Sequence, residues 1–158
     1  MATVGTRQTL ILTAAAGSAG LMIAALAFQY IGGLPPCQMC IWQRYPHVAA
    51  IALGALAVLL PGGARFIALL GGLALFATAA IGAFHAGVEQ GWWEGVTACA
   101  AGGDVTALST EDLLAQIMEA PVVRCDEIPW SLFGISMAGW NALLSLALAG
   151  VWVQAARA

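Results

Sequence analysis

The sequence predicts an all-α membrane protein, a four-transmembrane-helix bundle with one long outward loop that carries a short amphipathic surface helix. Two observations support this fold class. Of the 158 residues, 61% are hydrophobic and only 8% are charged, against about 25% charged residues in ordinary soluble domains. Four predicted spans, over about 10–31, 41–60, 66–84 and 132–153, have the ~20 residues needed to cross a bilayer. We therefore expect 1–158 to form a single integral membrane domain.

The first run carries no charge, and it exceeds the roughly 7–15 apolar residues of a signal peptide. We interpret it as an uncleaved span, although the Ala-Leu-Ala sequence at 25–27 resembles a cleavage site. The apolar part of the second segment, 48–60, is too short on its own, and it reaches spanning length only if its helix begins near Ile41. That start places Cys40 and Arg44 at the membrane–water boundary.

Four crossings put both termini on one side of the membrane. Of the five arginines, three fall on the side of the termini and two on the other: Arg7, Arg65 and Arg157 against Arg44 and Arg124. This is a weak positive-inside signal that predicts cytoplasmic termini. The net charge of −3 gives no basic surface of the kind that binds nucleic acid.

The connections over about 32–40 and 85–131 then face outward. The longer one contains STEDLLAQIMEA at 109–120, whose apolar residues share one helical face: Leu113, Leu114, Ile117 and Met118. We expect a short helix lying on the membrane surface. A soluble helix packed on the bundle is the alternative that the sequence leaves open.

All four cysteines fall in these outward connections, at Cys37, Cys40, Cys99 and Cys125. Haem attachment needs C-x-x-C-H, and Ile41 follows the motif here. A four-cysteine zinc site usually has two C-x-x-C knuckles, and this chain has one; no metal is expected. Structural disulfides remain open, but a C-x-x-C bridge closes a very small loop and constrains little unfolded chain. We therefore favour a redox-active pair.

The arginine after this motif supports redox chemistry. If Cys40 begins the second helix, the helix dipole favours its thiolate, and Arg44 lies one turn further on the same face. The guanidinium is also placed to bind the carbonyl oxygen of an electron acceptor. The alternative is an interfacial arginine that reaches lipid headgroups. A dithiol beside the bilayer suggests a lipid-soluble oxidant, whereas Cys99 and Cys125 are better placed for a soluble partner.

Three stretches now carry a resemblance: PCQMCIWQR at 36–44, FHAGVEQGWWEGVTAC at 84–99 and RCDEIPWSLFGISMAGWNAL at 124–143. With them the chain resembles the disulfide bond formation protein B (DsbB) family of bacterial inner-membrane thiol oxidases over essentially its whole length. The resemblance implies that the chain reoxidises a periplasmic, thioredoxin-like (DsbA-like) dithiol oxidase and passes the electrons to ubiquinone or menaquinone. It also implies periplasmic cysteines.

The resemblance divides the work between two cysteine pairs. Cys37 and Cys40 match the pair beside the quinone, where Cys40 and Arg44 meet the ring. Cys99 and Cys125 match the pair that oxidises the partner, whose thiolate attacks Cys99 to give a mixed disulfide.

Further polar residues have functional and plain interpretations. His85 matches a family histidine near the quinone, or it is an interfacial histidine without chemistry. Glu89 is placed to orient His85 or relay a proton. We interpret His47 as interfacial, Trp130 as part of an aromatic belt, and Asn141 as a hydrogen-bonding residue between helices.

Three alternative functions remain open at this stage. The surface-helix loop differs in detail from well-known family members, so the chain is alternatively a paralogue dedicated to a specific partner. It is otherwise a non-catalytic membrane protein with two structural disulfides, or a metal-binding membrane module.

Overall fold

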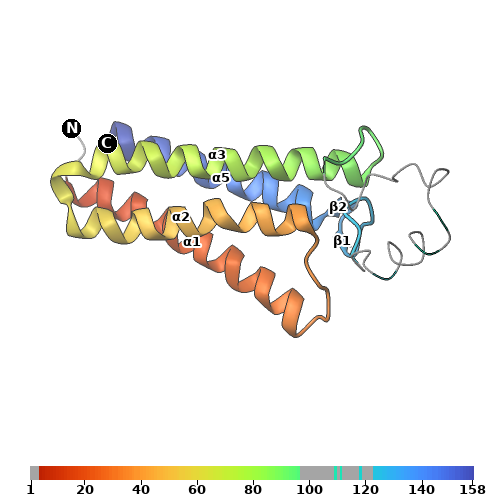
Figure 1. Ribbon diagram of the computed structural model, residues 1–158. Helices are drawn as coiled ribbons and strands as arrows, with labels where there is room; N and C mark the ends of the chain where they lie inside the picture. Colours follow the sequence, from red (N-terminus) through yellow and green to blue (C-terminus); the bar gives the residue numbers. More distant parts are fainter. Residues whose placement is uncertain (1–3, 97–108, 110, 112–117, 119–122) are drawn as a thin grey trace.

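The computed structural model describes residues 4–96, 109, 111, 118 and 123–158. Its long elements are all helices, which lie side by side in one bundle (Figure 1): α1 (Val4–Tyr30), α2 (Gln38–Leu59), α3 (Ala64–Glu89) and α5 (Met137–Arg157). The start of α1, the end of α5 and the short 3-10 helix η1 (Pro61–Gly63) share one end of the bundle. The strands β1 (Ser131–Leu132) and β2 (Ile135–Ser136) lie at the other end.

Three segments within the described ranges are long and apolar enough to cross a membrane: Gly5–Tyr30, Pro61–Glu89 and Met137–Arg157. They agree with three of the four expected spans. The fourth, α2, has 22 residues but carries Gln43, Arg44 and His47 in its first half, and these side chains lower its mean hydropathy. Its membrane crossing therefore stays a prediction.

Two helices are longer than expected and include residues that were predicted to lie in connections. α2 begins at Gln38 instead of Ile41, because Cys37 caps it: the Cys37 Sγ accepts a hydrogen bond from the Cys40 backbone N–H at 3.2 Å. α3 continues to Glu89, beyond the expected end at 84. Cys40 and the polar end of α3 are therefore held on rigid helices.

The start of the last helix also differs from the expectation. The apolar run from 132 predicted helix, but Leu132 pairs with Ile135 in a two-stranded hairpin, and α5 begins at Met137. The connecting residues Phe133 and Gly134 both have positive φ, 53° and 77°, as type I′ turns require. Ser136 then caps α5 by accepting from the Gly139 N–H at 3.1 Å.

The bundle core is built from small residues packed against a few large ones. Trp152 of α5 is fully buried, and a Cβ at Gly71 of α3 would come within 2.5 Å of its ring. Close helix packing around small residues is typical of membrane bundles. The buried face of α2 is apolar only in its second half: it consists of Met39, Gln43, His47, Ala50, Gly54 and Ala57.

The surface helix expected over 109–120 falls on a segment of which the structure describes only Ser109, Glu111 and Met118. This element therefore stays a prediction, and Cys99 lies outside the described residues.

Candidate functional site

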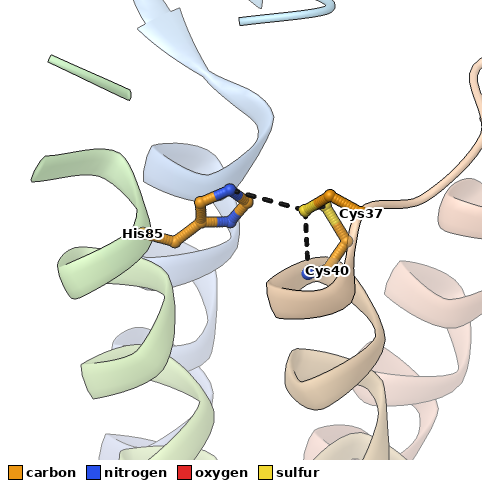
Figure 2. A group of neighbouring side chains, drawn as sticks. All are labelled: Cys37, Cys40 and His85. Carbon is orange, nitrogen blue, oxygen red and sulfur yellow. Dashed lines mark hydrogen bonds between the residues drawn. The ribbon is translucent and has the colours of Figure 1, made fainter. Parts of the chain in front are cut away.

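Cys37 and Cys40 meet His85 at the end of the bundle that carries the hairpin. Figure 2 shows the two sulfur atoms at the start of α2 and the imidazole ring pointing toward them from α3. The sulfur atoms are 2.8 Å apart without a disulfide between them, and the Cys37 Sγ is 3.6 Å from the His85 Nε2. Cys37 is 5% exposed and His85 is 2% exposed. The structure thus joins the C-x-x-C motif to a histidine that is distant in sequence.

The proton shared by the two sulfur atoms resides on Cys37. The hydrogen bond with Cys40, together with burial, raises the pKa of the Cys37 thiol to about 12. A thiol with this pKa stays protonated at neutral pH and donates to its neighbour. Because the two groups titrate as a pair, Cys40 is the sulfur that loses its proton before Cys37 does. This agrees with the expectation that Cys40 is the thiolate, and its position in the first turn of α2 favours that charge.

Two backbone carbonyls determine which nitrogen of His85 carries the proton. The Gln43 Nε2 donates to the Met39 carbonyl at 3.1 Å, so this atom is the amide nitrogen, and it lies 2.9 Å from the His85 Nδ1. The Nδ1 therefore accepts. The Nε2 lies 3.2 Å from the Cys125 carbonyl, which can only accept. His85 is thus a neutral imidazole with its proton on the Nε2, directed at the Cys37 sulfur and the Cys125 carbonyl.

His85 thereby connects the C-x-x-C pair to the segment around Cys125. Cys125 is completely buried and packs in one apolar cluster with Cys37, Met39 and Val88. One Glu89 carboxylate oxygen is 3.9 Å from the His85 Nε2, one turn along α3. The 2% exposure of His85 does not agree with an interfacial histidine that reaches the lipid headgroups. The expected position of Glu89 close to His85 is confirmed.

A polar network continues from Gln43 into the bundle. The Asn141 Nδ2 donates to the Gln43 Oε1 at 2.7 Å and to the Thr78 Oγ1 at 3.3 Å, which confirms the expected interhelical role of Asn141. Its Oδ1 lies 2.9 Å from the His47 Nε2. The prediction that His47 is interfacial is wrong: it is 3% exposed, because α5 supplies a polar partner inside the bundle.

A cavity of about 390 Å³ opens beside Cys40 between α1, α2, α5 and the hairpin region. Its walls are mostly apolar, and the polar side chains among them come from α2 and α5: Cys40, Gln43, Arg44, His47 and Asn141. Trp130 also lines it and packs against Phe28 with ring centroids 5.0 Å apart, so it is more than part of an aromatic belt. α1 diverges from α2 toward this end of the bundle (Figure 1).

Arg44 contributes a fixed cation to the cavity wall. Its Nη1 donates to the Gln29 Oε1 of α1 at 2.7 Å, and the side chain lines the same cavity as Cys40. The half-buried guanidinium has further N–H donors besides the one used by Gln29. Arg44 and Cys40 therefore line one cavity, as their spacing predicts, and Gln29 is an anchor that the sequence did not indicate.

The same cluster has three donor atoms that approach metal-binding geometry. The Cys37 and Cys40 sulfur atoms and a His85 ring nitrogen lie within 4.8 Å of one another. The cysteine spacing alone does not indicate this group, because His85 is distant in the sequence. The tautomer argues against a metal ligand, because the Nε2 that faces the sulfur atoms carries a proton and offers no lone pair. In this state His85 acts as a hydrogen-bond donor to sulfur.

Comparison with known proteins identifies a family and several relatives. The family model described as "Disulfide bond formation protein DsbB" matches residues 7–155. A disulfide bond formation protein B from Chromohalobacter salexigens is 35% identical over 131 residues, 78% of this chain and 74% of its own. The protein of that name from Methylococcus capsulatus is 34% identical over 137 residues, 82% of each chain. No solved structure matches.

Proposed function

The chain belongs to the disulfide bond formation protein B family, and from this membership we propose that it is a quinone-reducing thiol oxidase for a DsbA-like periplasmic partner. Membership itself makes it a bacterial inner-membrane oxidoreductase of disulfide bond formation. The proposal adds the electron acceptor, the partner and the residues that serve them. One observation carries it: the Cys40 sulfur, which lies 2.8 Å from the Cys37 sulfur, lines a mostly apolar cavity whose wall includes the Arg44 guanidinium.

The cavity fits a quinone by its chemistry. A quinone head is a flat, apolar ring with two carbonyl oxygens, and the cavity offers apolar walls, the Trp130 and Trp140 rings, and the Arg44 guanidinium. The His47 Nδ1 is a buried ring nitrogen that lacks a hydrogen-bond partner within the described part of the chain. A bound quinone supplies an acceptor for two electrons and two protons. Ubiquinone and menaquinone share these features.

The residues around the cavity have distinct tasks in this proposal. With a quinone bound, Cys40 would present its thiolate to the ring, and Arg44 would hold a ring oxygen by donating hydrogen bonds to it. Cys37 would hold its proton until the two sulfur atoms join in a disulfide. That oxidation would release two electrons and the Cys37 proton to a bound quinone, whose second proton would come from solvent. The His85 N–H stabilises negative charge as it develops on the Cys37 sulfur.

Electrons reach Cys37 and Cys40 by thiol–disulfide exchange. The partner dithiol attacks Cys99, and its two thiols become a disulfide while the Cys99–Cys125 disulfide becomes two thiols. These thiols then reduce the Cys37–Cys40 disulfide, so each exchange moves two electrons and two protons. The short connection from the Cys125 carbonyl through His85 to Cys37 supports this order.

The proposal includes the membrane arrangement that this relay needs. α2 forms the fourth span, since its polar side chains Gln43 and His47 are paired inside the bundle instead of facing lipid. The η1 end of the bundle, with both chain ends, faces the cytoplasm. The cysteine end then faces the oxidising periplasm, where a soluble dithiol partner meets it.

The test is quinone reduction by the purified full-length chain with a reduced thioredoxin-like dithiol protein. We expect loss of quinol formation in Cys40→Ser. A Cys40→Ser variant that keeps the rate would show that the mechanism is wrong. Thiol trapping of the resting chain separates the proposal from two structural disulfides, which resist mild reductant.

A further inference from the structure

His47 lines the same cavity further along α2 than Cys40 and Arg44, the two residues of this helix already assigned to the ring. It follows Cys40 by seven residues on α2, about 10.5 Å along the helix axis, with Arg44 between them. It lines the cavity and is 3% exposed. Its Nε2 is 2.9 Å from the Asn141 Oδ1 and 3.3 Å from the Ser145 Oγ. Its Nδ1 has no partner among the side chains and backbone that the structure describes.

The network that determines the tautomer of His85 also determines that of His47. Gln43 is oriented by the Met39 carbonyl, so its Oε1 accepts and the Asn141 Nδ2 donates to it. The Asn141 Oδ1 is then an acceptor, and the Ser145 hydroxyl donates to it at 3.3 Å. The His47 Nε2 that faces this oxygen must carry the proton. The Nδ1 is therefore a bare lone pair in a buried site.

The buried lone pair of the His47 Nδ1 interacts differently with the oxidised and the reduced form of a quinone ring. A quinone oxygen is an acceptor only and gains nothing from a second acceptor, whereas a hydroquinone hydroxyl donates. Resting on the proposed function, we propose that the His47 Nδ1 accepts a hydrogen bond from a hydroquinone hydroxyl, so that the cavity binds the hydroquinone more tightly than the quinone. His47 is then a binding residue that senses the reduction state of the ring.

Equilibrium binding of a quinone and its hydroquinone tests the role of His47 without catalytic turnover. The full-length chain carries Cys40→Ser, so that sulfur and ring exchange no electrons, and it is titrated in detergent with a decyl-tailed benzoquinone and its hydroquinone. Quenching of tryptophan fluorescence reports occupancy, since Trp130 and Trp140 line the cavity. We expect the hydroquinone to bind about three- to tenfold more tightly, which is the effect of one net hydrogen bond.

Two substitutions of His47 form a matched pair. His47→Gln places its amide near the position of the Nε2, so it keeps the contact with Asn141 and loses the acceptor at the Nδ1. His47→Asn places its amide near the Nδ1 and loses the contact with Asn141. We expect the ratio of hydroquinone affinity to quinone affinity to fall to about one in His47→Gln. In His47→Asn the hydroquinone should still bind more tightly than the quinone. An unchanged preference in His47→Gln would overturn the inference.

The outcomes separate this inference from the proposed function. Binding of neither ring form would refute the proposed function, whereas equal binding of both forms would refute only the role of His47. If His47→Gln fails to fold, the unsubstituted histidine decides the question by nitrogen NMR. We expect the Nδ1 resonance to shift when the hydroquinone is added and to stay in place with the quinone; no shift with the hydroquinone would overturn the inference.

Discussion

Replacement of Gln43 by leucine tests whether the buried polar network holds the site together. Gln43 is 6% exposed, and its side chain connects three helices. Its Nε2 contacts the His85 Nδ1 of α3 at 2.9 Å, and its Oε1 accepts from the Asn141 Nδ2 of α5 at 2.7 Å. Leucine has a similar size but makes neither contact, so the change removes hydrogen bonds without opening a large cavity.

The expected decrease in the free energy of unfolding follows from the hydrogen bonds that Gln43→Leu removes. Two interhelical hydrogen bonds disappear, each worth about 0.6 kcal/mol in membrane proteins. The His85 Nδ1 is left buried and unpaired, which adds about 1–3 kcal/mol. The Asn141 Nδ2 keeps its contact with the Thr78 Oγ1 at 3.3 Å and adds little. We expect the free energy of unfolding of Gln43→Leu to fall by about 2–4 kcal/mol.

The assay is denaturant unfolding of the full-length chain in detergent micelles, followed by circular dichroism. Gln38→Leu is the matched control, because Gln38 is an exposed glutamine on the same helix, and its change should stay within about 0.5 kcal/mol. If Gln43→Leu and Gln38→Leu have the same free energy of unfolding, the polar network does not stabilise the bundle. The tautomers assigned to His85 and His47 from this network would then lose their support.

Two other predictions concern the cavity and the thiols. Ala25→Phe inserts a ring into the cavity wall and should weaken binding of a quinone analogue at least tenfold, whereas Ala77→Phe on the exposed face of α3 should not; equal effects would contradict the assigned site. In the reduced chain at pH 8, iodoacetamide should label Cys40 before Cys37, whose pKa of about 12 keeps it protonated. Peptide mass spectrometry measures the order, and earlier labelling of Cys37 would reverse the assignment of the thiolate.

The sequence was sufficient for features that depend on local composition and spacing. Apolar length predicted three helices that the structure confirms as candidate spans. The spacing of Cys40 and Arg44 correctly placed both side chains beside one site. These features are fixed by a few neighbouring residues, so no knowledge of distant contacts was needed.

Other features depended on contacts between distant segments and were missed. The run after Trp130 is as apolar as a helix, yet Phe133 and Gly134 adopt positive φ and form a hairpin turn. The partner of His47 is Asn141, which is 94 residues away in the chain. One signal was present: Gln43 and His47 follow Met39 at intervals of four, and Ala50 and Gly54 continue the same face. A stripe with polar residues among apolar ones indicates a helix with polar partners inside the bundle.

The polarity of α2 and the function proposed for it have the same origin. Cys40, Gln43, Arg44 and His47 all line the cavity from this one helix. A span facing only lipid and apolar neighbours would lose stability from each of these side chains. Here Gln43 and His47 are paired with Asn141, and Arg44 is paired with Gln29. α1 and α5 therefore supply the partners that allow α2 to carry reactive and charged groups. The least apolar helix is, for this reason, the one that presents the sulfur to the cavity.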